Sequence, residues 1–346
     1  MLHLGPIPLT LPAVQAALSG YSDLPMRRVA RRRGAPVCFH EVVLDRLVVE
    51  PGKTSRRILE VRPDDHPLGG QLMGSEPRLF AQAAQQMVAA GFDLVDLNFG
   101  CPVPRHLGRC RGGFLLGEPE SALAIISAVL DAVGGRVPVM VKLRRGVDDS
   151  AAAEAAFFKI LEGAFARGIA AVIVHARTVQ QRYAGRSRWE FLAKVKRAVG
   201  ARTVLGSGDL FSPFAAQRLL RETGIDGVSF ARGAIGNPWI FTQLRDLLAG
   251  GVPMLPSLAE QREALTEHWA EAVQVHGRGK ALGWVRAHAI QYARLHPEPI
   301  RARDTFVACK SAERFEAVLA ELYAEGRFPA TARALLAADA PDPCVS

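Results

Sequence analysis

Eight short apolar runs, separated by stretches with a helical period, constrain the fold of this chain more than any other feature. The runs lie at 11–17, 35–43, 67–73, 93–99, 137–144, 170–176, 202–209 and 226–233. Strands that alternate with helices pair in parallel and carry the helices outside. Eight such units predict an α/β protein with a (β/α)8 TIM barrel over 1–250. A doubly wound open sheet is the alternative, but it rarely has so many units and no GxGxxG follows the first run.

A second region begins after a proline-broken stretch, GGVPMLPS, at 250–257. Beyond it the strand-like runs stop, and Leu258, Leu265, Trp269 and Val273 fall on one helical stripe. Further helical patterns cover 281–295 and 311–324. We therefore predict a small C-terminal all-helical domain over 258–336, followed by a frayed tail at 337–346.

Charge and cysteine content narrow the class of protein. The net charge of +9 is compatible with a nucleic-acid partner without requiring one. The five cysteines (38, 101, 110, 309 and 344) include no CxxC pair or other metal spacing, so we expect no metal site and a reducing, cytoplasmic location. No run of about 18 apolar residues occurs, so we expect no membrane segment.

Polar and glycine residues lie at the ends of six consecutive strand-like runs, where a barrel of this kind carries its chemistry. These residues are Gln71, Asn98, Cys101, Lys142, Arg144, His175, Arg177, Gly206–Asp209 and Ala231–Gly233. The last two groups, GSGD and ARG, end the final two runs, where backbone N–H groups often bind phosphate. Tight turns that need glycine are the other explanation for these loops.

The remaining strand-end residues suit a planar cofactor with polar edges. Lys142 lies in an apolar run, and a buried lysine is costly unless it meets an anion or an acceptor. Gln71 can both donate and accept, as reading an amide edge requires. His175 fits the same cofactor, although one histidine on an apolar strand is more often a core residue. Together these residues suit a planar, polar-edged cofactor such as a flavin.

Cys101 is the candidate catalytic residue. A free cysteine is most often an inert, buried side chain. Cys101, however, follows its strand rather than lying within it, and Arg105, His106, Arg109 and Arg111 come soon after. A thiol that gives up a proton during a reduction acts as a general acid. We therefore interpret Cys101 as a proton donor.

Taken together, these motifs resemble the tRNA-dihydrouridine synthases, flavin enzymes that reduce uridine in transfer RNA. The segment AALSGYSDLPMRR resembles the first-strand region of that family. The stretches HEVV, QLMG, DLNFGCP, VKLRRG, HART, GSGD and ARGAIGNPWIF follow in the family's order. NFGCP with its downstream double glycine is the most specific of them.

The resemblance implies FMN as cofactor, NADPH or NADH as reductant, and tRNA as partner; we expect a monomer. It implies cofactor contacts from Ala16, Ala17, Leu18, Gln71, Lys142, His175, Ser207, Gly208, Asp209, Ala231, Arg232 and Gly233. Cys101 would protonate C5 of the uracil while reduced flavin delivers hydride to C6. Substrate or tRNA contacts would come from Asn98, Arg144, Arg177, Arg278, Lys280 and Arg286, the last three in an RNA-binding helical domain.

Three departures from the family pattern accompany the resemblance. Ser207 replaces an asparagine, His106-Leu107 replaces Val-Asn, and Ala17-Leu18 replaces Pro-Met. Two alternatives to a synthase follow: an FMN barrel that reduces a small molecule, and a tRNA-binding barrel that has lost turnover. Strongly salt-dependent tRNA binding separates the synthase from the first alternative, and bound flavin separates it from the second.

Overall fold

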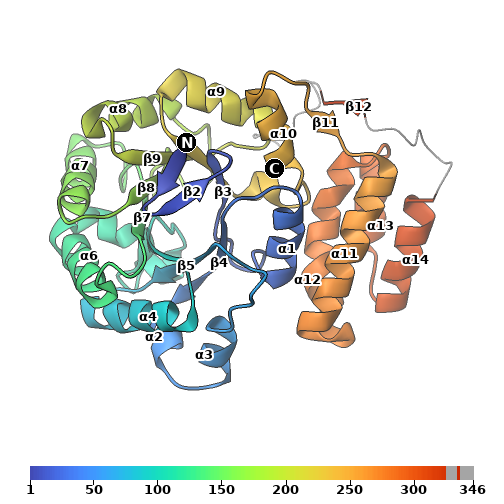
Figure 1. The fold of residues 1–346 in the computed structure, drawn as a ribbon, viewed down its shortest axis with the longest axis horizontal. Helices are drawn as coiled ribbons and strands as arrows, with labels where there is room; N and C mark the ends of the chain where they lie inside the picture. Colours follow the sequence, from blue (N-terminus) through green and yellow to red (C-terminus); the bar gives the residue numbers. More distant parts are fainter. Residues whose placement is uncertain (325–332, 336–346) are drawn as a thin grey trace.

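The computed structural model describes residues 1–324 and 333–335. Its core is a closed barrel of eight parallel strands, each hydrogen-bonded to the next around the ring (Figure 1). The strands are β3 (Ala13–Gln15), β4 (Cys38–Leu44), β5 (Leu68–Met73), β6 (Leu94–Phe99), β7 (Val139–Arg144), β8 (Ala171–His175), β9 (Thr203–Ser207) and β10 (Gly227–Phe230). The predicted TIM barrel is confirmed, because an open doubly wound sheet would leave two unpaired edges.

Helices surround the barrel, as the alternating pattern predicts (Figure 1). The principal ones are α1 (Leu24–Arg32), α4 (Pro77–Ala90), α6 (Pro119–Val133), α7 (Ala151–Ala166), α8 (Trp189–Val199), α9 (Pro213–Thr223) and α10 (Ile240–Leu248). Four of them begin with a proline at the first or second position, where its missing N–H costs no hydrogen bond. Shorter helices, α2 (Asp45–Val49), α3 (Lys53–Ile58) and α5 (Pro104–Leu107), lie in the connections.

The interior of the barrel is apolar at its amino-terminal end and polar at its carboxyl-terminal end. Alternate residues of each strand point inward, and Leu94, Met140, Ile173 and Leu205 form one buried apolar cluster there. A hairpin of β1 (Leu2–Leu4) and β2 (Ile7–Leu9) adds Leu4 and Leu9 to that cluster. Two positions further along β6, β7, β8 and β9 the inward residues become Asp96, Lys142, His175 and Ser207. The polar side chains therefore form a layer at the barrel mouth.

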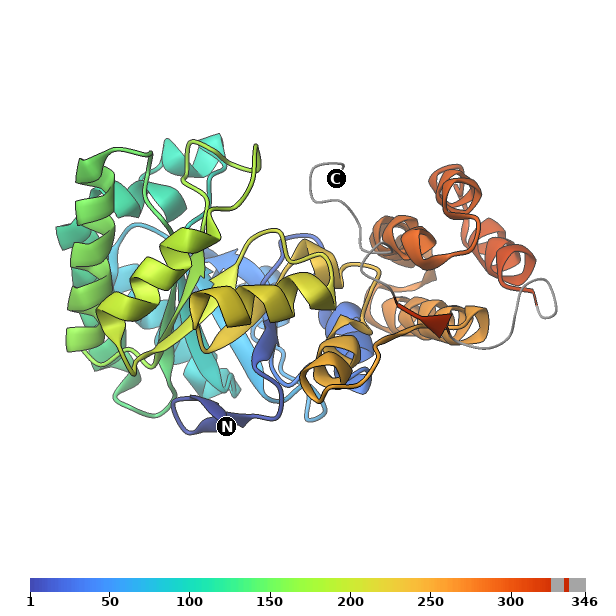
Figure 2. The ribbon, with the colours of Figure 1, turned by 90° about the horizontal axis from the view of Figure 1, so that it is seen from above.

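Four helices follow the barrel and lie beside it rather than around it (Figure 2). They are α11 (Leu258–His276), α12 (Arg278–Tyr292), α13 (Pro299–Val307) and α14 (Ala312–Leu322). They share an apolar core of their own, which includes Leu265, Val285, Phe306 and Phe315. A short ladder joins β11 (Met254–Leu255) to β12 (Arg333–Ala334). All of the predicted tail at 337–346, with Cys344, lies outside the described residues, as does 325–332.

Ion pairs join α1 and its C-cap, Arg33, to α11 across the interface between the barrel and the helices. Arg28 pairs with Glu271 at 2.5 Å, and Arg33 pairs with Glu267 at 2.7 Å. Near the mouth, His276 contacts Asp23 through Nε2 and Oδ2 at 2.9 Å. Because these pairs come from several turns of both helices, they fix the helical region in one orientation against the barrel.

The part of the chain that the structure describes contains no helix with the length and hydropathy needed to span a bilayer.

Candidate active site

Strand register brings the predicted site residues to one level of the barrel. Asn98 of β6 lies opposite Lys142 of β7, and His175 of β8 lies opposite Ser207 of β9. Gln71 of β5 lies opposite Asp96, two residues before Asn98. The polar residues that sequence analysis selected on five consecutive strands therefore line one side of the mouth.

A buried hydrogen-bond chain orients the amide groups in this layer. Gln71 donates from Nε2 to Oδ2 of Asp96 at 2.6 Å and accepts from Nδ2 of Asn98 at 2.7 Å. Asn98 Oδ1 in turn accepts from the N–H of Gly100 at 3.0 Å. Each amide keeps one hydrogen and one lone pair for another partner.

Asp96 is the acidic member of this layer, and it was not selected from the sequence. Its Oδ1 atom is buried without a hydrogen-bond partner among the described residues. Burial raises the pKa of Asp96, against the opposing effects of the hydrogen bond from Gln71 and the charge of Lys142. Its position after Leu94 on the inward face of β6 was the available signal, since residues two apart share a face.

Lys142 is partly buried and makes no hydrogen bond or ion pair with any described residue. Burial lowers the pKa of Lys142 to about 8, and the neighbouring charge of Arg144 acts in the same direction. An ammonium group held at the mouth without a partner fits an electron-rich ring edge, which would supply the missing acceptor.

His175 is held as one neutral tautomer. Burial is the main reason that its pKa lies well below the ordinary value, and the charge of Arg144 adds to the effect. Nδ1 accepts from the N–H of Arg177 at 3.2 Å, so the remaining proton lies on Nε2. His175 is thus a neutral donor beside Lys142, and the donor set of this layer fits one edge of a flavin ring.

The loops after β9 and β10 approach other groups too closely for larger residues. At Gly208, which has φ of +112°, a Cβ atom would lie 2.2 Å from Oγ of Ser187. At Gly233 a Cβ atom would lie 2.0 Å from the carbonyl oxygen of Leu210. No described residue accepts from the N–H groups of Gly208 or Asp209. Two free N–H groups with Arg232 nearby fit a phosphate.

The Asp209 carboxylate is neutralised within the site. Arg177 donates from Nη2 to both of its oxygens, at 2.7 and 2.9 Å, and the N–H of Ser187 donates to Oδ2 at 2.8 Å. Arg232 lies further away, at 4.0 Å. Because Arg177 is nearly fully buried in this pairing, the structure places it beneath the loops rather than at the open mouth.

The segment after β3 closes the other side of the mouth. The N–H of Ala16 donates to the carbonyl of Phe230 at 2.8 Å, which brings Ala16 beside the loop that starts at Ala231. Ala16 is buried, while Ala17 and Leu18 are partly buried. Together they give this side of the mouth an apolar wall.

Cys101 lies half-buried at a cleft of about 650 Å³. Its own loop also contributes Arg105 and His106, and the helical region contributes Gln274, His276, Lys280 and Trp284 to the same cleft. Gly112, at φ of +59°, lies so close that a Cβ atom there would be 2.7 Å from Cβ of Cys101. The double glycine therefore lets the loop fold back onto the cysteine.

The three residues predicted for RNA contact in the helical region differ in their surroundings. Lys280 is exposed, lines the cleft and forms no ion pair with a described residue. Arg278 is paired with Glu316 at 2.6 Å and with Glu313 at 3.3 Å. Arg286 donates to the carbonyl of Cys309 at 3.0 Å. Only Lys280 of the three combines exposure at the cleft with an unpaired charge.

Sequence analysis also missed an aromatic pair at the cleft. The rings of His276 and Trp284 stack with centroids 4.6 Å apart and an angle of 7° between their planes. His276 ends α11 and Trp284 lies on α12, so the contact depends on how the two helices meet. No local pattern in the sequence could have indicated it.

Comparison with protein families gives one match across most of the chain. The sequence model of dihydrouridine synthase matches residues 14–325. A probable tRNA-dihydrouridine synthase of Rickettsia conorii is 33% identical over 85% of this chain and 87% of its own length. The tRNA-dihydrouridine synthase B of Pseudomonas aeruginosa is 32% identical over 91% of this chain and 96% of its own length.

Solved structures show a similar fold at much lower identity. The histamine dehydrogenase of a Rhizobium species aligns with a TM-score of 0.56 and 17% identity, over 78% of this chain and 50% of its own. A 2-naphthoyl-CoA reductase aligns with a TM-score of 0.57 and 10% identity, over 72% of this chain and 52% of its own. These likenesses concern the barrel architecture.

Proposed function

Since the chain belongs to the dihydrouridine synthase family, we propose that it is an oxidoreductase that reduces the C5–C6 double bond of uridine in tRNA. The observation that carries the proposal is the position of Cys101. Its thiol borders a cleft whose walls come from both the barrel and the helical region, near the layer of donors that would bind a flavin ring. A flat base can enter such a cleft only after it leaves its stack in the RNA, and the cleft must hold it there.

FMN is the cofactor that the donor set fits. Lys142, His175 and Gln71 would contact the ring edges, and Ala16, Ala17 and Leu18 would line the ring. The phosphate would lie on the loops Ser207–Asp209 and Ala231–Gly233, near Arg232. When bound, FMN would supply the hydride for C6 of the uracil, with NADPH or NADH as the source of its electrons.

The chain's own residues would supply the proton and stabilise the charges that the reduction requires. Cys101 would donate the thiol proton to C5 and regain a proton from solvent through the open cleft. Lys142 would stabilise negative charge on the ring, because an ammonium in a partly buried site interacts more strongly than in water. Asn98 would use its remaining amide hydrogen and lone pair toward the ring and the base.

The tRNA would lie along the cleft between the barrel and the helices. Lys280 and Arg57 line it as exposed cations, and Arg105 adds a third from the cysteine loop. Such side chains bind phosphate and make affinity depend on salt. The surroundings of Arg278 and Arg286 leave these two side chains less available than Lys280.

Replacing Lys280 with alanine is expected to weaken tRNA binding several-fold and to reduce the slope of log K against log salt by about 0.7–0.9. Arg278→Ala is the matched control, because the Arg278 charge is already paired with Glu313 and Glu316. Filter binding or anisotropy over a range of salt concentrations measures both variants. Equal losses of tRNA affinity in the two variants would contradict the proposal that tRNA lies along this cleft.

The proposed function is tested by reconstituting the purified protein with FMN and NADPH and supplying tRNA that lacks dihydrouridine. Mass spectrometry of the digested tRNA is expected to show uridines that have gained two hydrogens. A flavin-loaded protein that ignores tRNA but oxidises NADPH with a small enone would instead support the small-molecule reductase. A protein that binds tRNA yet takes up no FMN would support a barrel without turnover.

A further inference from the structure

We infer that Arg144 is a positioning residue, which clamps the cysteine loop to the loop that follows β8 and so fixes where the thiol of Cys101 lies. The inference rests on the proposed role of Cys101. It gives Arg144 a different task from the substrate contact that sequence analysis predicts.

Three hydrogen bonds define the backbone around Cys101. The N–H of Gly100 donates to Oδ1 of Asn98 at 3.0 Å, and the carbonyl of Gly100 accepts from Nε of Arg144 at 2.8 Å. The carbonyl of Cys101 accepts from the N–H of Gly113 at 2.9 Å. Both peptide groups next to the cysteine are thereby tied to the barrel or to the far end of its loop. Arg144 supplies one of the two bonds that come from side chains of the barrel.

The other end of the Arg144 guanidinium holds the neighbouring loop. Its Nη1 donates to the carbonyls of Thr178 at 2.8 Å and Arg182 at 2.7 Å. The Tyr183 ring then covers the guanidinium, with Cζ 5.6 Å from the ring centroid. One side chain thus connects two loops that are separate in sequence and come from different strands.

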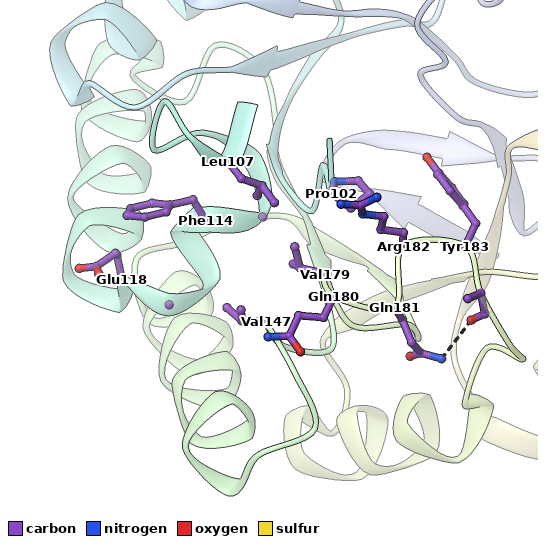
Figure 3. A pocket seen from close by; sticks show the side chains of 13 residues that line it. Pro102, Leu107, Phe114, Glu118, Val147, Val179, Gln180, Gln181, Arg182 and Tyr183 are labelled. Atoms are coloured by element: carbon purple, nitrogen blue, oxygen red, sulfur yellow. Dashed lines mark hydrogen bonds between the residues drawn. The ribbon is translucent and has the colours of Figure 1, made fainter. Parts of the chain in front are cut away.

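A cavity of about 840 Å³ lies between these two loops (Figure 3). Pro102, Leu107 and Phe114 line it from the cysteine loop. Val179, Gln181 and Tyr183 line it from the loop after β8. Gly113 and Val179 also approach each other, since a Cβ atom at Gly113 would lie 2.6 Å from Cγ2 of Val179. Because a cavity separates the loops elsewhere, we expect loss of the Arg144 clamp to have a large local effect.

Burial also separates Arg144 from the RNA. Only 3% of the residue is exposed, and its Nε and Nη1 groups already donate to three carbonyl oxygens. Three of the five N–H donors of the guanidinium therefore serve the protein, and the loss of this side chain would leave those carbonyl groups without their donor. The contacts that Arg144 makes therefore favour a role within the protein.

The test uses Arg144→Met, with Arg145→Met as the matched control. Arg145 is similarly buried and adjacent in sequence, but it contacts Gln181 and Asp149 instead of the cysteine loop. In flavin-free protein, the rate of alkylation of Cys101 by iodoacetamide is measured by peptide mass spectrometry, which reads each cysteine separately. We expect a several-fold faster reaction in Arg144→Met and a rate close to wild type in Arg145→Met.

In reconstituted enzyme, Arg144→Met is expected to lower kcat by about 100-fold, because a displacement near 1 Å has effects of that size. KM for tRNA and the salt slope of binding should stay unchanged. An unchanged alkylation rate overturns the inference, and so does weaker tRNA binding with a shallower salt slope. If Arg144→Met does not fold, Arg144→Lys is judged by the same criteria, since a lysine cannot reach both loops. The alkylation measurement needs neither flavin nor tRNA. It therefore tests whether Arg144 positions Cys101 even if the wild-type protein forms no dihydrouridine.

Discussion

Replacing Cys101 with alanine is expected to reduce dihydrouridine formation by about 10²–10⁴-fold while the protein still binds FMN. The size of the loss is that of a missing general acid. Alanine fits the site, since it removes only the sulfur from a half-buried position beside the cleft. The measurement is single-turnover reduction of tRNA by prereduced enzyme, together with the visible absorbance of the bound flavin.

Cys110→Ala provides the control for this result. Cys110 is exposed on the same loop and does not line the cleft. Normal turnover is expected from this variant. Turnover by Cys101→Ala at the wild-type rate would remove the thiol from the mechanism and leave the proton to another group.

Replacing Lys142 with methionine is expected to slow flavin reduction by NADPH by about 10²-fold, as for loss of one preorganised donor in an active site. Methionine keeps the length of the side chain and removes the charge. Stopped-flow absorbance at saturating NADPH measures the step, and equilibrium titration measures FMN affinity. Lys159→Met, on the outer face of α7, is the control and should match wild type.

Lys142 should also make the rate of flavin reduction depend on pH. Burial lowers the pKa of Lys142 to about 8, so the ammonium is present below that pH and is lost above it. The rate of flavin reduction in wild type should therefore fall as the pH rises through about 8. Lys142→Met should show no such fall. An identical pH profile in both proteins would assign the ionisation to another group and make the lysine structural.

The architecture could be predicted from the sequence because the barrel strands are local patterns. Each of the eight apolar runs corresponds to a strand, and the stretches with a helical period between them contain helices such as α4, α6, α7, α8 and α9. The hairpin of β1 and β2 was missed, since two strands of three residues leave little periodicity. Helix α13 was missed because its nine residues carry several charges and a weak apolar stripe.

Only part of the candidate site could be predicted, because only that part depends on local patterns in the sequence. Residues at strand ends can be found from the strands, which is how Lys142, His175 and Gln71 were selected. Partners cannot be found in this way, because they depend on contacts between distant segments. The pairing of Arg177 with Asp209 and the stacking of His276 on Trp284 are both of this kind.

If the chain acts on tRNA as proposed, the ion pairs between α1 and α11 would influence which nucleotide it modifies. Because these ion pairs fix the helices against the barrel, they fix the distance between Lys280, which would bind the RNA backbone, and the thiol of Cys101. A folded RNA whose backbone lies on Lys280 would then place in the pocket the nucleotide whose distance from that contact equals the distance from Lys280 to the thiol. A change of the modified nucleotide would then require a different orientation of the helices, through the ion pairs of Glu267 and Glu271. The catalytic residues of the pocket could stay the same.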